Sequence, residues 1–176
     1  GVGAGPADPA RARGRYARSK AVAELDALAA DSPALAVLAV RPHLVWGPGD
    51  TQLVGRIVER ARAGRLPVIG SGAALIDTTY VDNAAAALVA AVDACGPVHG
   101  EALVVSNGEP RPVAEVLGRL CRAAGVPGPR GRVPFGAAWV AGAAAEGVWA
   151  ATRRRSVPPL TRFLAEQLAT AHWFDQ

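Results

Sequence analysis

Short, uniformly apolar runs alternate along this chain with longer segments whose apolar residues recur at helical spacing. The run 35–40 is apolar throughout and is bounded by Pro33 and Pro42, as expected of a strand covered on both faces. Ahead of it, the apolar positions of residues 14–30 recur every three or four residues, which predicts a helix. Strands that alternate with helices favour an α/β fold built on a parallel sheet.

The rest of the chain continues this alternation. Asp50 or Thr51 is placed to N-cap a helix, and Asp82 is placed to N-cap a later one. Pro112 suits the first turn of a third helix, and the pair 107–108 (Asn-Gly) predicts a turn. The pattern predicts strands at 67–69, 76–81 and 102–105, helices ending at Ala63, before Gly96 and at Ala124, and a mainly helical C-terminal third.

The basic residues do not indicate a nucleic-acid partner. The formal net charge is +4, and nearly all of the 19 basic residues are arginines. Nucleic-acid binding needs a basic face interleaved with aromatic side chains, or a known module. The arginines here are scattered, apart from the run 153–155, and such a run is typical of a solvated helix end.

The sequence gives little indication of a metal site or of a membrane-spanning segment. Cys95 and Cys121 lie far apart and the three histidines share no ligand spacing, so no metal site is predicted and both thiols are expected to be reduced. No signal peptide is visible, and we expect a cytoplasmic protein. Residues 133–151 are apolar apart from Glu146, but they are interrupted by glycines and barely long enough to span a bilayer. A buried or surface-lying helix is expected there, and peripheral membrane contact stays open.

The first residue is glycine, and the chain contains no methionine. We therefore expect it to be the C-terminal part of a longer protein, with a processed N-terminus as the alternative.

Tyr16 and Lys20 are spaced for proton transfer. Residues four apart on a helix share one face, with Cβ atoms about 5–6 Å apart. Lowering a phenol pKa from about 10 to about 7 requires roughly 4 kcal/mol. A positive charge at about 5 Å supplies only about 0.8 kcal/mol in water but about 3 kcal/mol at a dielectric of about 20. The pair therefore needs a partly closed cleft and a second positive charge. Lys20 is the only lysine of the chain, which suggests a position that requires an ammonium group.

Three more segments follow this pair in order: 41–49 (RPHLVWGPG), 79–84 (TYVDNA) and 104–109 (VVSNGE). Together with Tyr16, Lys20 and the Ala-Glu pair at 23–24, they resemble the motif set of the extended short-chain dehydrogenases/reductases, in the NAD-dependent epimerase/dehydratase superfamily. The run 158–163 further resembles the C-terminal region of 3β-hydroxysteroid dehydrogenase-like and 3-ketoacyl-type reductases. The set is more specific than any one of its members.

The resemblance implies a cofactor, NAD or NADP, and a role for each matching residue. Tyr16 would exchange a proton with the substrate hydroxyl. Lys20 would lower the tyrosine pKa and hydrogen-bond the nicotinamide ribose. The backbone of Pro42, His43 and Leu44 would face the carboxamide, with the His43 ring left as a loop side chain.

Two family features are missing. The glycine-rich dinucleotide fingerprint is absent, and so is a convincing catalytic Ser or Thr upstream of Tyr16. The resemblance therefore implies a partial Rossmann-like, doubly wound sheet. Residues 1–48 would end the dinucleotide-binding domain. Residues 49–176 would form a mainly helical substrate-binding portion, interleaved with late strands at about 76–110. We expect the isolated chain to be inactive.

The predicted substrate is lipophilic. Nucleotide-sugar members of the family usually carry an arginine five residues before the valine of the YVDN segment, and here Ile76 takes that place. An aliphatic side chain cannot make a bidentate phosphate contact. Ile76 and Tyr80 are therefore expected on the substrate side, although either could simply pack. In that alternative, Arg56 or Arg111 would hold a phosphate.

The leading hypothesis is an NAD(P)-dependent oxidoreductase, 3β-hydroxysteroid dehydrogenase-like, that interconverts a secondary alcohol and a ketone on a 3β-hydroxysteroid, a sterol-like molecule or a β-keto acid. The alternatives are a nucleotide-sugar epimerase or dehydratase, a noncatalytic dinucleotide-binding sensor or scaffold, and a membrane-associated protein. The choice between NAD and NADP, the reaction direction, the exact substrate and the oligomeric state, including a homodimer, stay open.

Overall fold

The computed structural model describes residues 5–12, 14–153, 158 and 160–175, and its contacts divide the chain into two compact units. Strands alternate with helices, which confirms the predicted α/β class. The segments of the two units interleave along the sequence. Unit 1 consists of Gly1–Pro48, Asp77–Glu109 and Phe174–Gln176, and unit 2 of Gly49–Ile76 and Pro110–Trp173.

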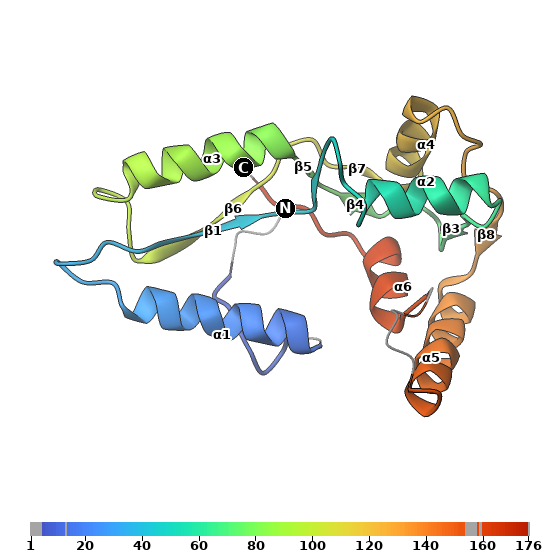
Figure 1. Ribbon diagram of the computed structural model, residues 1–176, viewed down its shortest axis with the longest axis horizontal. Coiled ribbons are helices and arrows are strands. Elements are labelled where there is room, and N and C mark those ends of the chain that lie inside the picture. The colour runs from blue at the N-terminus through green and yellow to red at the C-terminus, as the bar shows by residue number, and fades with distance from the viewer. Residues whose placement is uncertain (1–4, 13, 154–157, 159, 176) are drawn as a thin grey trace. The chain divides into compact units, whose positions relative to one another are not determined.

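Unit 1 is built on two short parallel strand pairs and two helices. In chain order its elements are α1 (Arg15–Ala29), β1 (Leu38–Pro42), β2 (Val45–Trp46), β5 (Thr79–Tyr80), α3 (Val81–Ala94) and β6 (Glu101–Val105). β1 pairs with β6 and β2 pairs with β5, both in parallel. Figure 1 shows α3 above and α1 below the β1–β6 pair. The helix and the strand predicted at 14–30 and 102–105 are confirmed.

The apolar run 35–40 predicted a buried strand over all of its residues. β1 begins only at Leu38, and its residues are more exposed than the run predicted. All of its residues are half-exposed, and Leu35 is 54% exposed in a bridge with Ser32. The carboxylate of Asp31 accepts a hydrogen bond from the Val37 backbone N–H at 2.8 Å, which holds the first part of the run in a turn. Helices α3 and α1 lie on the two faces of β1, as expected, but they leave its residues partly exposed.

α3 begins two residues earlier than predicted. Tyr80 is its N-cap residue and no side chain caps the helix, so the predicted N-cap role of Asp82 is wrong. Asp82 lies instead in the first turn, where a negative charge interacts favourably with the helix dipole. Because Val81 follows β5 directly, strand and helix leave no residue between them for a separate cap.

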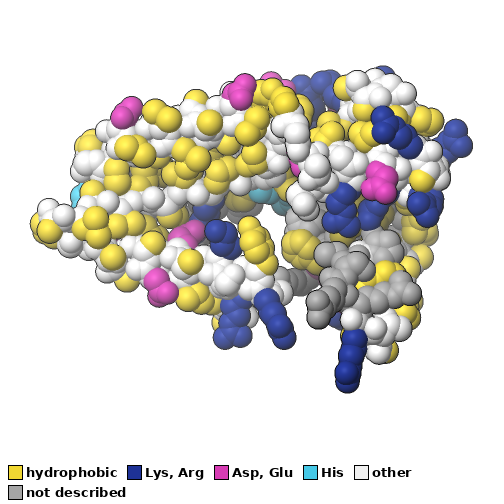
Figure 2. Space-filling model, viewed as in Figure 1, with side chains coloured by type: hydrophobic (Ala, Val, Ile, Leu, Met, Phe, Trp, Pro, Cys, Tyr) yellow, Lys and Arg dark blue, Asp and Glu magenta, His cyan; other side chains and the backbone are white. Residues whose placement is uncertain are grey.

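Polar contacts, more than apolar burial, hold unit 1 together. Its buried residues in the described ranges are Asp77, Thr79 and Ala84. The Asp31 carboxylate also contacts Nδ1 of His99 at 2.9 Å, and the hydrogen bonds from Val37 and His99 hold the pKa of Asp31 below its ordinary value. Hydrophobic side chains lie along the exposed side of α3 (Figure 2).

Unit 2 is mainly helical, as predicted for the C-terminal third. Its elements are α2 (Val54–Arg62), β3 (Val68–Ile69), β4 (Leu75–Ile76), β7 (Arg111–Pro112), α4 (Val113–Ala123), β8 (Arg132–Val133), α5 (Phe135–Ala151) and α6 (Arg162–Ala169). β3 pairs with β8 in parallel, and β4 pairs with β7 in antiparallel orientation. The run predicted as one strand at 76–81 is divided between β4 in unit 2 and β5 in unit 1.

Three small hydrophobic clusters form the core of unit 2. The first joins α2 to α4, the second joins β3 to α5 and α6, and the third joins β4 to α4. Their buried members are Ala61, Leu66 and Cys121; Ile69, Ala138 and Ala165; and Ile76, Val113 and Leu117. Burying one such side chain contributes about 1.5–3 kcal/mol for residues as large as valine or leucine. Cys95 and Cys121 are free thiols, as predicted, and burial raises the pKa of Cys121.

α5 covers most of the apolar segment 133–151. Only Ala138 and Gly142 of this helix are buried, so it lies at the surface of unit 2, one of the two placements expected. Among the described helices, none is both long and apolar enough to span a bilayer. Of the arginine run that follows, residues 154 and 155 lie outside the described residues.

α5 approaches the start of α6 closely at Gly142. A Cβ atom on Gly142 would lie 2.7 Å from the backbone nitrogen of Arg162 and 2.7 Å from the carbonyl carbon of Thr161. Backbone atoms cannot move aside as a flexible side chain can. Gly147, on the same helix, has nothing within 4 Å of the equivalent position.

Gly142→Ala is therefore expected to destabilise the protein by about 1–3 kcal/mol through overpacking. Gly147→Ala is expected to stabilise it by up to about 1 kcal/mol, because alanine favours the helix more than glycine does. Urea unfolding of both variants tests the pair. Effects of the same sign would show that the helices do not meet at Gly142.

The turn before α2 is organised by one carboxylate. Asp50 accepts hydrogen bonds from the backbone N–H groups of Gln52, Leu53 and Val54 at 2.7, 3.0 and 2.9 Å. Leu53 is the N-cap residue, so neither Asp50 nor Thr51 holds the predicted position, yet Asp50 still binds the first N–H of the helix. Desolvation raises the pKa of Asp50, but the three hydrogen bonds outweigh it and hold that pKa below the ordinary 3.8.

A carboxyl group with a lowered pKa contributes stability above its unfolded pKa, about 3.9, and loses that contribution as the pH falls through the folded pKa. Asp50→Asn should therefore lower the unfolding free energy by roughly 1 kcal/mol at pH 7. This deficit should shrink as the pH falls below about 4. Urea unfolding at pH 7, 4 and 3 measures it, and a deficit that does not depend on pH would contradict the assignment.

Candidate active site

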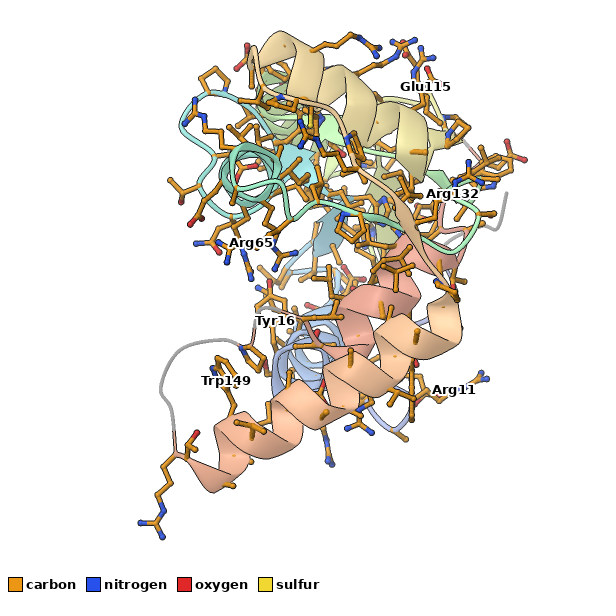
Figure 3. All side chains as sticks on the ribbon, turned by 90° about the vertical axis from the view of Figure 1, so that its right-hand side faces the viewer. Arg11, Tyr16, Arg65, Glu115, Arg132 and Trp149 are labelled. Atoms are coloured by element: carbon orange, nitrogen blue, oxygen red, sulfur yellow. The ribbon has the colours of Figure 1, made fainter. Side chains whose placement is uncertain are left out.

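α1 carries the predicted proton-transfer pair in its first two turns. Tyr16 and Lys20 are four residues apart in a continuous helix, so they share one face. Tyr16 lies near the N-terminal end of α1 (Figure 3), and 77% of its surface is exposed. Lys20 is exposed as well. Both functional groups are thus accessible, and the described residues do not enclose them.

A bidentate ion pair fixes α1 against β1. The guanidinium of Arg41 donates to both carboxylate oxygens of Glu24, with Nε 2.6 Å from Oε2 and Nη2 in a still shorter contact with Oε1. The two side chains are largely buried, and the Glu24 hydrogen bonds hold the pKa of Arg41 above its ordinary value. Glu24 lies one turn after Lys20, so this contact anchors the face that carries the pair.

The segment predicted to face the nicotinamide lies at the carboxyl end of the parallel pair. β1 ends at Pro42 and β6 ends at Val105, and the backbone N–H of His43 donates to the carbonyl oxygen of Val105 at 2.9 Å. Ligands of α/β folds bind outside the carboxyl ends of parallel strands. Leu44 follows with φ of 45°, a left-handed conformation that is uncommon outside glycine. Pro42, His43 and Leu44 therefore lie together at the edge where a ligand is expected.

Two buried polar residues support this edge. The hydroxyl of Thr79 lies 2.7 Å from the carbonyl oxygen of His43 and 3.0 Å from that of Val105. The carboxylate of Asp77 accepts hydrogen bonds from the Ser106 hydroxyl at 2.5 Å and from the Thr78 N–H at 2.9 Å. Sequence reasoning did not single out Asp77 or Thr79. An aspartate directly after the apolar stretch 73–76 was the available signal.

The His43 ring has a structural role. Its Nδ1 lies 2.9 Å from the carbonyl oxygen of Asp77, so this nitrogen carries the proton and donates it. The ring also contacts Phe174 edge to face, with the centroids 5.2 Å apart. The sequence predicted no role for the His43 side chain beyond its place in a loop. In the structure, the ring fixes the segment after β1 through these two contacts.

Tyr80 packs beside the same edge. Its ring meets that of Trp46 at a centroid distance of 5.3 Å, and the indole N–H of Trp46 donates to the Thr78 hydroxyl at 3.1 Å. The backbone N–H of Tyr80 donates to the side-chain oxygen of Asn107 at 3.1 Å. Gly47 is required here, because a Cβ atom at that position would overlap Val81.

Ile76, the other residue expected on the substrate side, lies in unit 2. It is 9% exposed and packs with Val113 and Leu117, as the packing alternative describes. A substrate contact by Ile76 stays a prediction. Of the two arginines considered as phosphate ligands, Arg111 lies 3.3 Å from Glu115. Arg56 lines a groove of unit 2.

The sequence of the chain is similar to that of known oxidoreductases. Residues 8–133 match the 3-beta hydroxysteroid dehydrogenase/isomerase family. The 2-alkyl-3-oxoalkanoate reductase of Stenotrophomonas maltophilia (strain K279a) is 49% identical over 163 residues, which are 91% of this chain and 49% of the reductase. The chain therefore spans about half the length of this curated relative.

Solved structures share the fold. The crystal structure of gox2253 superposes with a TM-score of 0.67 at 20% identity, covering 97% of this chain and 50% of that one. A dTDP-glucose 4,6-dehydratase from Bacillus anthracis, solved in complex with NAD, has a TM-score of 0.55 at 23% identity, covering 69% and 40%. These similarities confirm the resemblance that the motifs predicted. The family match extends over α1, the edge at Pro42–Leu44 and the YVDN segment, and the chain belongs to the 3-beta hydroxysteroid dehydrogenase/isomerase family.

Proposed function

We propose that the complete protein is an NAD(P)-dependent oxidoreductase that reduces the ketone of a lipophilic β-keto acid to a secondary alcohol, or catalyses the reverse reaction. The observation that carries the proposal is the Tyr16–Lys20 pair, held at helical spacing on a helix that is anchored beside the carboxyl ends of two parallel strands. The substrate class follows from the 49% identity to a 2-alkyl-3-oxoalkanoate reductase. The family name favours a 3β-hydroxysteroid as the second candidate.

The described residues fit the nicotinamide end of a dinucleotide. The Tyr16 hydroxyl and the Lys20 ammonium are exposed hydrogen-bond donors on one helical face, suited to ribose hydroxyls and a reacting oxygen. Pro42, His43 and Leu44 would line the carboxamide side. No glycine-rich G-x-G-x-x-G segment for the pyrophosphate occurs in the 176 residues. When bound, NAD(P)H supplies the hydride to the carbonyl carbon.

Tyr16 supplies the proton in the reducing direction. As the carbonyl π bond breaks and the carbon takes the hydride, the Tyr16 hydroxyl protonates the oxygen, which becomes the alcohol. Lys20 stabilises the phenolate that remains until solvent reprotonates it. One charge at about 5 Å contributes about 3 kcal/mol only where the effective dielectric is about 20. The pair, which is exposed in this chain, therefore acts when cofactor and substrate exclude water from it.

Tyr16→Phe in the complete protein is expected to lower kcat by about 10²–10⁴-fold, the usual contribution of general acid catalysis. The affinity for NAD(P)H should be retained, because the ring remains. The measurement is NAD(P)H oxidation with a 2-alkyl-3-oxoalkanoate as substrate. Asp26→Asn, at an exposed position of the same helix, is the matched control and should keep full turnover. Unchanged turnover in Tyr16→Phe would rule out Tyr16 as the proton donor, whereas cofactor binding without turnover in the unsubstituted protein would favour a sensor or scaffold.

Glu24 is a positioning residue in this scheme. Glu24→Gln leaves Arg41 with a neutral partner, and charged hydrogen bonds contribute about 1.5–3 kcal/mol where neutral ones contribute about 0.5–1.5. We expect a loss of roughly 1 kcal/mol in unfolding free energy. We also expect a fall of about tenfold in kcat with little change in KM, measured at a temperature where the variant is fully folded. A loss of stability without a change in kcat would show that the ion pair serves the fold alone.

A further inference from the structure

Unit 2 contains a groove whose lining includes none of the candidate active-site residues named above. Its volume is about 460 Å³, within the range of about 300–1,000 Å³ that is usual for small-molecule sites. It lies between the end of α2, with the loop that follows it, and the surface formed by β3, β8, α5 and α6. All of its lining residues belong to unit 2.

Positive charge gathers on one side of the groove. Arg56 and Arg60 are one turn apart on α2, and Arg65 follows the helix; Figure 3 shows Arg65 beside α2. Glu59 is the acidic residue of the lining, so the arginines leave an excess of two positive charges. Burial lowers the pKa of Arg60, and the charge of Arg56 acts in the same direction against the opposing effect of Glu59. Neither Arg56 nor Arg65 forms an ion pair with a described residue.

The opposite side of the groove is aliphatic. It includes Ile69 of β3, Val133 of β8 and Leu168 of α6, with Leu160 before α6. These residues border the hydrophobic cluster that joins α5 and α6, so the groove has a packed floor. None of the lining residues, all of which are described, is aromatic. A nucleotide base would therefore find no ring to stack on.

We propose that this groove binds a long-chain carboxylate. The guanidinium groups of Arg56 and Arg65 hold the carboxylate, a geometry that arginine favours through paired N–H donors. The alkyl chain lies on Ile69, Val133 and Leu168, where its burial removes apolar surface from water. An anion at the arginines also relieves the mutual repulsion of the charges on α2. The inference deepens the proposed function and rests on it, because the proposed β-keto acid is itself a long-chain carboxylate and residues 49–176 are the portion expected to bind the substrate.

The test is isothermal titration of the complete protein with decanoate, in the absence of NAD(P). Decanoate should bind, while butanoate and decan-1-ol, which lack the chain and the charge respectively, should bind at least about tenfold more weakly, a difference of about 1.4 kcal/mol. The double variant Arg56→Gln/Arg65→Gln keeps the aliphatic stems and should raise the Kd of decanoate by at least about tenfold. Circular dichroism of the double variant verifies that it is folded.

Two control variants separate this site from its alternatives. Arg122→Gln removes a charge from an exposed arginine of α4 outside the groove and should leave the Kd unchanged. Tyr16→Phe should also leave it unchanged. Failure of the proposed oxidoreductase activity would not affect these titrations. The inference is overturned if decanoate does not bind, if Arg122→Gln weakens binding as much as the double variant, if only Tyr16→Phe weakens it, or if AMP displaces decanoate.

Discussion

The buried hydroxyl of Thr79 holds the edge on which the candidate active site is built. It lies within hydrogen-bonding distance of the carbonyl oxygens of His43, which immediately follows β1, and Val105, which ends β6. A valine there would keep the shape but lose the donor, and buried polar groups that lose a partner cost free energy. Thr79 thus links the segment that follows β1 to the end of β6. The side chain of Asp77 fixes the neighbouring loop through Ser106.

The two units are stabilised by different physical means. All three hydrophobic clusters of the described residues lie in unit 2. They pack its helices against one another and against its short strands. Unit 1 depends on its strand pairs and on ionic contacts such as Glu24–Arg41 and Asp31–His99. Unit 2 has ion pairs as well, at Arg111–Glu115, Arg119–Glu115 and Arg162–Glu146. The two units therefore differ in their apolar cores, and ionic contacts make the stability of both depend on salt and pH.

Local patterns in the sequence were sufficient for the helices and for the position of the reactive pair. The spacing of apolar residues predicted α1, and with it the shared face of Tyr16 and Lys20. Contacts between distant segments were out of reach, because nothing local marks Arg41 as the partner of Glu24 or Asp77 as the partner of the His43 ring. The predicted start of β1 was wrong for a related reason. The Asp31–Val37 hydrogen bond holds the first residues of the apolar run in a turn, so the strand begins after them.

The absence of a side chain at Gly142 affects how the wall of the arginine groove can move. Packed helices usually accommodate ligands by sliding past one another over small distances. Here the backbone of Thr161 and Arg162 already occupies the space beside Gly142, so sliding would drive main chain into main chain. Ala138 of α5 and Leu168 of α6 both face the groove. We therefore expect this close contact to oppose sliding of α5 past α6, so that the groove would widen more readily on the α2 side.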